Sequence, residues 1–201
     1  MPASQPVALS ERFSSADCAA CWQDAATPTP GPQALVLDWI VPGRLEDEAP
    51  LSAAATRDAL HRLQALGRAA PGATDVHTAP VEPLPGLHLR VGHGPAINDY
   101  LGATAVLTAP RPAADWAFHL LLVERIPAGD EVSAVARNVV RNALEGTWDK
   151  RHALSFKKQF RWHELRPMRI PDGARPERLR TVGWVQDTQG RVVVVAQSAC
   201  R

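Results

Sequence analysis

The fold is best inferred from the segment Ala34-Leu35-Val36-Leu37-Asp38-Trp39-Ile40-Val41. It is nearly continuous apolar sequence, and prolines at positions 32 and 42 bound it on both sides. Apolar runs of this length are typical of strands that are covered on both faces of a sheet. We therefore expect residues 34–41 to form a central strand, with the rest of the fold arranged around it.

The segment before this strand predicts a first strand that turns into a short helix. Residues 7–13 carry the pattern of a short strand, and residues 14–17, Ser-Ser-Ala-Asp, are helix-capping types that stand directly before Cys18. Any helix that begins there must be brief, because the segment 27–32 contains three prolines, which remove amide donors and clash with the preceding turn. We expect this helix to end near Ala26.

Downstream of the central strand, the sequence predicts one helix and then a strand-rich region. Leucines recur near helical spacing in residues 52–68, with Ser52 available as a cap and Gly67 or Gly72 as a stop, so this segment is predicted to be helical. After Pro80, short apolar runs separated by Gly, Pro and Asp indicate antiparallel strands. The expected strands lie within residues 87–91, 103–109, 116–126, 153–162 and 181–199.

The clearest supersecondary element is a hairpin near the C-terminal end. Residues 180–186 and 191–198 are both strand-like, and they are joined by Asp187-Thr188-Gln189-Gly190. Asp is suited to starting such a turn, and Gly adopts positive φ without a steric cost. Residues 131–145 fit a helix and a strand equally well, so their structure stays open at this point.

Charge is divided unevenly along the 201-residue chain, whose net charge is only +1. Residues 1–149 hold 10 basic against 17 acidic side chains, whereas residues 150–201 hold 12 against 4. Such opposed fields favour docking of one half on the other, or head-to-tail association into a homo-oligomer. No apolar stretch approaches the roughly 20 residues of a membrane-spanning helix, so we expect a soluble protein without a membrane partner.

The N-terminal residues lack both the basic start and the apolar segment of a secretion signal. The compartment is therefore left open: periplasmic if an exported precursor was trimmed, and cytoplasmic otherwise. The chain has three cysteines, which exclude the dense disulfide framework of a small secreted domain, because at most one bridge can form within the chain.

The one motif that carries chemistry is Cys18-Ala19-Ala20-Cys21. Two cysteines at this spacing and at a helix N-terminus can close a small disulfide, and the free amides and dipole there stabilise the thiolate of the first. That is the arrangement that thiol–disulfide exchange needs. Two other interpretations stay open: a fixed disulfide or buried thiols, and half of a zinc site. A metal site is not expected, because there is no second cysteine pair and Cys200 is far away in sequence.

Four sequence blocks follow one another along most of the chain: two small residues between Cys18 and Cys21, then Asp38-Trp39, Asn138-Val139-Val140-Arg141 and Val185-Gln186-Asp187. Together they resemble a small thioredoxin-like bacterial family of unknown function, whose members are often exported. One departure is that Trp22 follows the second cysteine, where the family typically has proline. In the third block, we expect the valines to pack and the polar ends to bond to loops or to the acidic half.

The resemblance implies an α+β fold with two parts. A reduced thioredoxin-like half, residues 1–80, would pack on an antiparallel β-rich half, residues 81–201. After Pro80 a thioredoxin domain would continue with a hairpin and a packed helix, whereas this chain passes straight into the strand-rich half. We therefore expect the first part to depend on the second for its stability.

The resemblance also implies a redox site. Cys18 would attack a disulfide and Cys21 would resolve the mixed disulfide, with a protein or a small thiol as the redox partner and no cofactor. A thioredoxin-like site places a cis-proline beside the dithiol, and Thr78-Ala79-Pro80 is the best match, so Trp22, Ala79 and Pro80 are expected to contact substrate. The rival hypothesis is a non-enzymatic binding or scaffold protein with structural or silent cysteines, so whether this chain is an enzyme is left open.

Residues 150–180 are basic, with 10 Arg and Lys against 3 Asp and Glu, and they include Phe156, Phe160 and Trp162. Such a mixture superficially fits a nucleic-acid surface. Strand alternation, however, places these aromatic residues on one face and Arg161 on the other. Nucleic-acid binding is therefore not expected.

Overall fold

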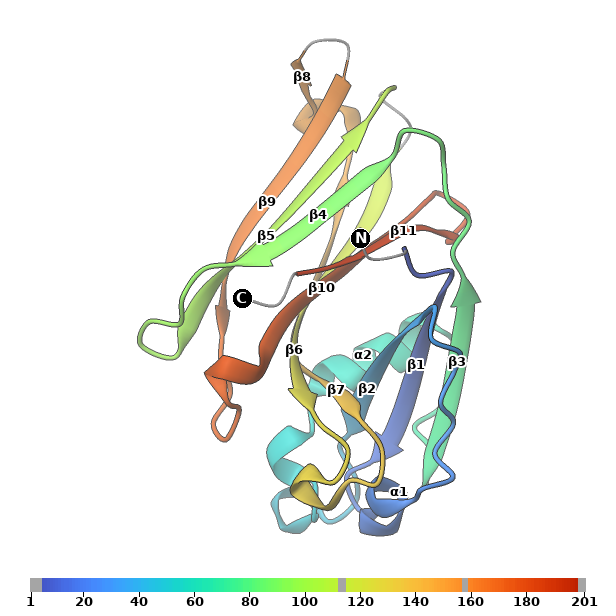
Figure 1. Ribbon diagram of the computed structural model, residues 1–201, viewed down its shortest axis with the longest axis vertical. Helices are drawn as coiled ribbons and strands as arrows, with labels where there is room; N and C mark the ends of the chain where they lie inside the picture. The colour runs from blue at the N-terminus through green and yellow to red at the C-terminus, as the bar shows by residue number, and fades with distance from the viewer. Residues whose placement is uncertain (1–4, 112–114, 157–158, 199–201) are drawn as a thin grey trace.

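Two β-sheets make up most of the molecule (Figure 1). The computed structural model describes residues 5–111, 115–156 and 159–198. In these residues the large sheet has the strand order β11-β10-β6-β7-β2-β1-β3, and the small sheet has the order β4-β5-β9-β8. The strands are β1 (Ala8–Ser15), β2 (Ala34–Val41), β3 (Thr74–Pro80), β4 (His88–His93), β5 (Tyr100–Ala109), β6 (Trp116–Ile126), β7 (Arg137–Trp148), β8 (Leu154–Phe156), β9 (Gln159–Arg169), β10 (Leu179–Gln186) and β11 (Val192–Gln197). The α-helices are α1 (Ala19–Gln23) and α2 (Arg57–Ala65), and short 3₁₀ turns occupy Glu46–Glu48, Ser52–Ala54, Asp130–Val132, Lys150–His152 and Pro176–Arg178.

The apolar stretch 34–41 is confirmed as a central strand. It forms β2, which lies inside the large sheet between β1 and β7. β1 runs parallel to β2 along its whole length, and β7 is also parallel to β2, with Asp38 opposite Val139. The predicted hairpin is confirmed as well, because β10 and β11 pair antiparallel and Gly190 in their turn has a φ of +78°.

The cysteine helix ends even earlier than expected, at Gln23. Asp24 stops it locally, since the Asp24 carboxylate accepts a hydrogen bond from the Ala26 amide at 2.8 Å and replaces a helical bond. Pro28 would clash with a helix continued through this segment. As a result, α1 has only five residues.

The second helix is also shorter than expected, because only residues 57–65 of the predicted segment 52–68 are α-helical. Thr56 caps α2: its hydroxyl accepts a hydrogen bond from the amide two residues later at 3.2 Å. Ser52 begins a 3₁₀ turn instead. No helix in the described part of the chain is long and apolar enough to cross a membrane.

Residues 131–145, whose structure the sequence left open, continue from a 3₁₀ turn into β7, which pairs with β6. The expectation for the Asn138-to-Arg141 block is confirmed. Asn138 donates a hydrogen bond to the Val36 carbonyl at 2.8 Å, and Arg141 donates one to the Ala53 carbonyl at 3.0 Å. The two valines between them are fully buried. This block therefore holds β7 in contact with β2 and with the 3₁₀ turn at Ser52–Ala54.

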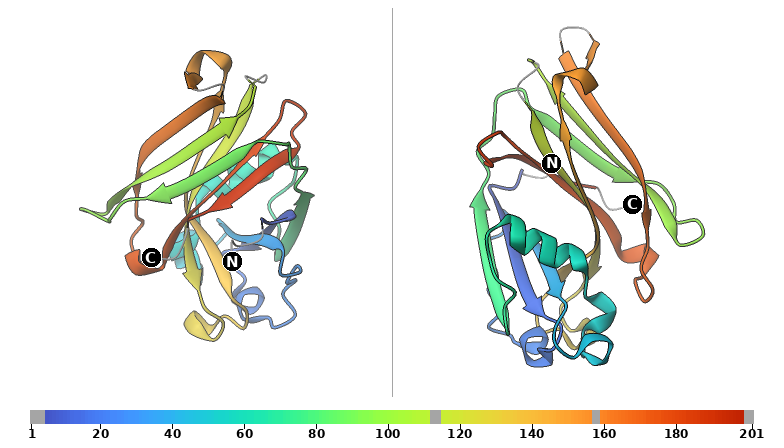
Figure 2. Two further views of the ribbon diagram at one scale, coloured as in Figure 1. Left: turned by 45° about the horizontal axis from the view of Figure 1, so that its top comes forward. Right: turned by 180° about the vertical axis from the view of Figure 1, so that it is seen from behind.

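The central part of the large sheet is buried on both faces. Along β6, strand alternation directs Leu120 and Leu122 toward the small sheet, and Leu121 and Val123 toward α2. The right-hand view in Figure 2 shows α2 lying across the large sheet in front of β1 and β2. On the small sheet, Trp162 is buried and Arg161 is exposed, as the predicted alternation requires for these two residues.

The α+β fold implied by the resemblance is wrong, because the molecule is mostly β. Strands hold 48% of the described residues and helices hold 15%. The physical reason lies on the face of the large sheet where α1 ends early. There Arg12 and Asp38 are buried, so β1 and β2 do not offer the apolar surface on which a helix packs. The large sheet also runs across the expected boundary at residue 80, since β2 pairs with β7.

Candidate functional site

The cysteine motif holds a disulfide between Cys18 and Cys21. Their α-carbons are 5.3 Å apart, within the range of about 4.4–6.8 Å that disulfides need. Both residues are partly buried, and they stand between the end of β1 and the first turn of α1. The predicted bridge at a strand-to-helix junction is thus confirmed. Cys200, the third cysteine, lies outside the described residues.

Cys18 is the N-cap residue of α1, and its sulfur accepts a hydrogen bond from the Cys21 amide at 3.2 Å. An amide in this position favours negative charge on the sulfur. When the bridge opens, this contact therefore stabilises a thiolate on Cys18.

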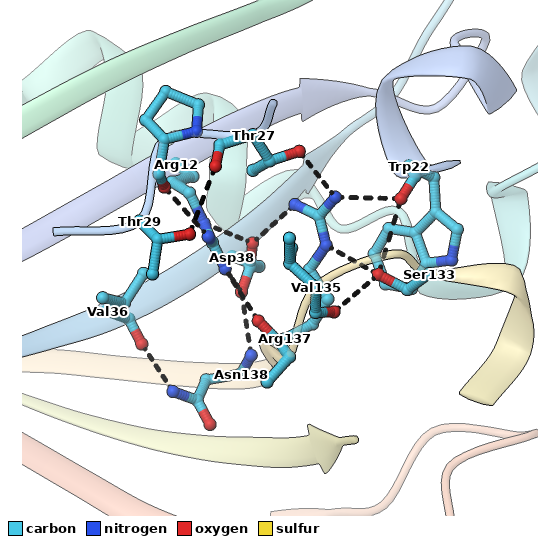
Figure 3. A network of polar contacts seen from close by, with 12 residues as sticks. Arg12, Trp22, Thr27, Thr29, Val36, Asp38, Ser133, Val135, Arg137 and Asn138 are labelled. Atoms are coloured by element: carbon cyan, nitrogen blue, oxygen red, sulfur yellow. Dashed lines mark hydrogen bonds and ion pairs between the residues drawn. The ribbon is translucent and has the colours of Figure 1, made fainter. Parts of the chain in front are cut away.

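Three buried charged side chains, which we call the Asp38 cluster, lie on the neighbouring strands: Arg12, Asp38 and Arg137 (Figure 3). Arg12 donates to Asp38 from Nε and Nη2, each at 2.8 Å, and Arg137 donates to it from Nη1 at 3.2 Å. The backbone N–H of Asn138 donates the fourth hydrogen bond to the Asp38 carboxylate, at 2.8 Å. Because arginine stays charged in proteins, two cations share one carboxylate and the cluster has an excess of one positive charge.

Arg137 ties this cluster to the cysteine helix. Its Nη2 donates to the carbonyls of Trp22 at 2.9 Å and Cys21 at 3.3 Å, at the C-terminal end of α1. Its guanidinium carbon lies 4.9 Å from the centre of the Trp22 ring, which is a cation–π contact. Burial lowers the pKa of Arg137, and the Asp38 carboxylate opposes that shift. A buried cation thus lies one hydrogen bond from the backbone of the second cysteine.

A cavity of about 250 Å³ opens next to Cys21. The two arginines of the Asp38 cluster line it, together with Thr74 and Asp75 at the start of β3. Asp75 is paired with Arg68 at 2.6 Å, and the hydrogen bond from Arg68 lowers the pKa of Asp75. The second cysteine therefore borders a cavity whose walls carry both signs of charge.

The structure does not bring Trp22, Ala79 and Pro80 together around the disulfide. Trp22 is buried, and its indole N–H donates to the Glu131 carbonyl at 2.7 Å. Ala79 and Pro80 lie at the far end of β3, where Pro80 stands opposite Ala8 at the start of β1, whereas the cysteines follow the end of β1. The expected cis bond is wrong, because the Ala79–Pro80 peptide bond is trans.

The start of β3, and not its end, lies beside the cysteines. Ser14 near the end of β1 pairs with Thr74, and because the two strands are antiparallel, β3 runs away from the disulfide. The sequence pattern, a proline after a short strand, carried no information on this register. On the β3 side, the cavity near Cys21 is accordingly lined by residues 73–76.

Sequence reasoning also missed the Asp38 cluster. The available signal was a mismatch: Asp38 interrupts an otherwise apolar strand, and Arg12 stands inside another strand. A buried charge of this kind needs a partner of opposite sign. The sequence pattern does not say which cation is that partner, because the answer depends on the strand order.

No family model matches this chain. No curated protein matches it either. Two solved structures of Bacteroides uniformis beta-glucuronidase 2 are similar to part of it: a calcium-binding mutant at 9% identity and a TM-score of 0.35, and a form covalently bound to cyclophellitol-6-carboxylate aziridine at 11% and 0.33. Each of these two covers 62% of this chain and 15% of that chain. MtrC from Shewanella baltica OS185 matches at 10% identity with a TM-score of 0.32, over 56% of this chain and 21% of that chain. This chain thus spans a small part of each matched protein, and likenesses at this level carry no argument.

The chemistry that the site supports follows from its own residues. A disulfide that is partly exposed and a sulfur that accepts an amide hydrogen bond both favour a thiolate once the bridge is reduced. Within residues 5–111, 115–156 and 159–198, no group of three His, Cys, Asp or Glu side chains is placed to hold a metal ion.

Proposed function

We propose that this protein carries out thiol–disulfide exchange at Cys18 and Cys21. The observation that carries the proposal is the placement of the bridge, which is partly exposed at a strand-to-helix junction with the Cys21 amide directed at the Cys18 sulfur. The buried cation of Arg137, which is hydrogen-bonded to the carbonyls of Cys21 and Trp22, favours an anionic sulfur in the same way. The blocks that resemble the exported family support this chemistry, and the relationship to that family is part of the proposal.

In the reducing direction, the Cys18 thiolate attacks one sulfur of a substrate disulfide and releases the other as a thiolate. The Cys21 thiolate then attacks Cys18 in the mixed disulfide, which releases the reduced substrate and closes the bridge. Two electrons pass from the two protein thiols to the substrate. A partner dithiol, or two molecules of a small thiol, restores the reduced state by supplying two electrons again.

Two observations favour the alternative, a binding or scaffold protein whose bridge is structural. The C-terminal end of α1 is held by Arg137, and Trp22 is anchored to the Glu131 carbonyl. In addition, the start of β3 places Ala73 and Thr74 near Cys21, where a thioredoxin-like site has a proline. In this alternative, the bridge fixes the N-terminal end of α1 as Arg137 fixes its other end.

The reduction potential of the Cys18/Cys21 couple, measured in glutathione buffers, tests the proposal directly. Exchange predicts a potential between about −270 and −120 mV, the range of exchange proteins. All proteins in the experiment carry Cys200→Ser, so that only the two thiols of the motif react. In this background, Cys21→Ser should accumulate a mixed disulfide with glutathione at Cys18, and Cys18→Ser should accumulate far less.

The same measurements identify the alternative. A structural bridge predicts a potential below about −300 mV. A value in that range, together with no mixed disulfide in Cys21→Ser, would rule out exchange in favour of the scaffold role.

A further inference from the structure

A second cavity lies between α2 and strands β6, β7 and β10. Its volume is about 280 Å³, close to the small end of ligand pockets. It opens on the opposite face of the large sheet from the disulfide, because strand alternation along β2 directs Asp38 to one face and Trp39 to the other. We call these the disulfide face and the α2 face. The second cavity does not depend on the exchange proposal.

A row of side chains crosses the strands on the α2 face. Glu145 on β7 stands opposite His119 on β6, and His119 stands opposite Trp184 on β10. The rings of His119 and Trp184 are stacked with their centres 4.3 Å apart, and the Arg62 guanidinium lies 5.2 Å from the centre of the Trp184 ring. Trp39 also lines the cavity.

The two tryptophans of this cavity offer a ligand almost no surface. Trp184 is fully buried, with His119 stacked on its ring and Arg62 over it, and Trp39 is 2% exposed. The side chains that a ligand can contact are therefore the less buried ones, which include Ala143, Leu144 and Glu145.

Hydrogen bonds place the proton of His119 on Nε2. The side-chain amide of Gln186 donates to the Gly190 carbonyl at 2.7 Å, which leaves its Oε1 as the atom 2.8 Å from His119 Nε2. His119 Nε2 must therefore donate to Gln186. Burial, and next the charge of Arg62, lower the pKa of His119 to about 4, so the ring is neutral near neutral pH and Nδ1 keeps a lone pair.

Nδ1 of His119 faces a carboxylate oxygen of Glu145 at 3.7 Å. Both atoms are acceptors while His119 is neutral, so a group with N–H donors is needed to satisfy them together. The charge balance points the same way. Arg62 is paired with the buried Glu11 at 2.7 Å, whereas Glu145 and Asp58 have no Arg or Lys partner among the described residues. The cavity therefore has an excess of negative charge.

We propose that this cavity binds a small organic cation that carries N–H donors, of the amidine or amine class. Its donors bridge Nδ1 of His119 and the carboxylate of Glu145, and its apolar part packs against Ala143 and Leu144. An anion is disfavoured because the only arginine in the wall is already paired. The volume admits a molecule of about one ring.

Three probes of one shape and different charge test this proposal: benzamidine, a cation; benzamide, which is neutral; and benzoate, an anion. Isothermal titration calorimetry of the full chain near neutral pH should show benzamidine binding at least about 10-fold more tightly than benzamide, with no measurable binding of benzoate. The affinity for benzamidine should not change when the disulfide is reduced, because the cavity lies on the other face of the sheet.

Variants of the full chain sharpen the test. Glu145→Gln removes the charge of a side chain that is 69% exposed, so it should weaken benzamidine about 10-fold without lowering the Tm. Glu48→Gln, the matched control, removes an exposed carboxylate outside the cavity and should leave the affinity unchanged. His119→Phe keeps a ring on Trp184 but removes Nδ1, and it should weaken benzamidine as Glu145→Gln does.

Four results would each overturn the proposal. They are tighter binding of benzoate than of benzamidine, equal binding of all three probes, an unchanged benzamidine affinity in Glu145→Gln, and no heat with any probe at millimolar concentration.

Discussion

The two faces of the large sheet around β1 and β2 are built in opposite ways. On the α2 face, Leu63 of α2 packs into an apolar cluster with Phe13 and Trp39. On the disulfide face, the proline-containing connection between α1 and β2 lies over buried charges, and the Pro28 carbonyl accepts a hydrogen bond from Arg12 at 3.1 Å. A loop with free carbonyls can satisfy a buried arginine, whereas the carbonyls inside a helix are already bonded.

Each of these two strands, β1 and β2, specifies what covers both faces of the sheet. Adjacent residues on β1, Glu11 and Arg12, and on β2, Asp38 and Trp39, point to opposite faces and have different partners. Each face also carries a candidate site beside the segment that covers it. The disulfide lies where α1 begins, and the proposed cation cavity lies where α2 meets the polar row on β6, β7 and β10.

The largest expected effect on stability comes from the disulfide face. Asp38→Ala leaves Arg12 and Arg137 buried without an anion, so the free energy of unfolding should fall by about 3–5 kcal/mol. Urea unfolding followed by tryptophan fluorescence measures this loss. The matched control is Asp172→Ala, which removes a carboxylate that is 96% exposed and should change the same quantity by less than about 0.5 kcal/mol. A loss below about 1 kcal/mol for Asp38→Ala would contradict the description of the cluster.

On the α2 face, a smaller effect is expected from shortening an apolar side chain. Leu63→Ala removes a side chain that is 2% exposed, so the free energy of unfolding should fall by about 3 kcal/mol. Leu60→Ala changes a leucine on the same helix that is 38% exposed, and it should cost less than about 1 kcal/mol. Since both changes have the same helix propensity, equal losses would show that the packing of α2 on the sheet does not stabilise it.

The parts of the fold that the sequence predicted well are those that local signals specify. β2 follows from a continuous apolar run bounded by prolines, and the C-terminal hairpin follows from its Asp-to-Gly turn. The fold class depends on what the inward faces of the strands carry. Arg12 and Asp38 look like isolated exceptions in the sequence, yet they make one face of the sheet unsuitable for a helix.

The candidate site divides in the same way. The Cys18–Cys21 bridge was predictable, because the two residues are three positions apart and local geometry brings them together. The Asp38 cluster was not, because Arg137 reaches Asp38 from 99 positions away. The place of Pro80 was also beyond local signals, since it depends on the antiparallel register of β3 against β1.

The smallest expected effect is a pH dependence that belongs to the α2 face. Burial and the Arg62 charge lower the pKa of His119 to about 4 in the folded protein, whereas the ordinary value is 6.5. Between these values the unfolded chain binds a proton that the folded protein does not, so stability is lost as the pH falls from about 6.5 towards 4. From this group alone, the free energy of unfolding should be about 2 kcal/mol lower at about pH 5 than at about pH 7.

Urea unfolding of the wild type and of His119→Gln at these two pH values measures this contribution. The variant should lose about 2 kcal/mol less on acidification, because glutamine does not titrate. Burial also lowers the pKa of His77, so His77 acts in the same direction in both proteins and cancels in the comparison. Arg62 from α2 lowers the pKa of His119 and the hydrogen bond to Gln186 from β10 opposes that shift, while Glu145 from β7 and Asp58 from α2 are the carboxylates of the same cavity. An equal loss in both proteins would mean that His119 is not held neutral. The acceptor pair that His119 forms with Glu145 would then not exist, and the proposed cation site would lose its main polar contact.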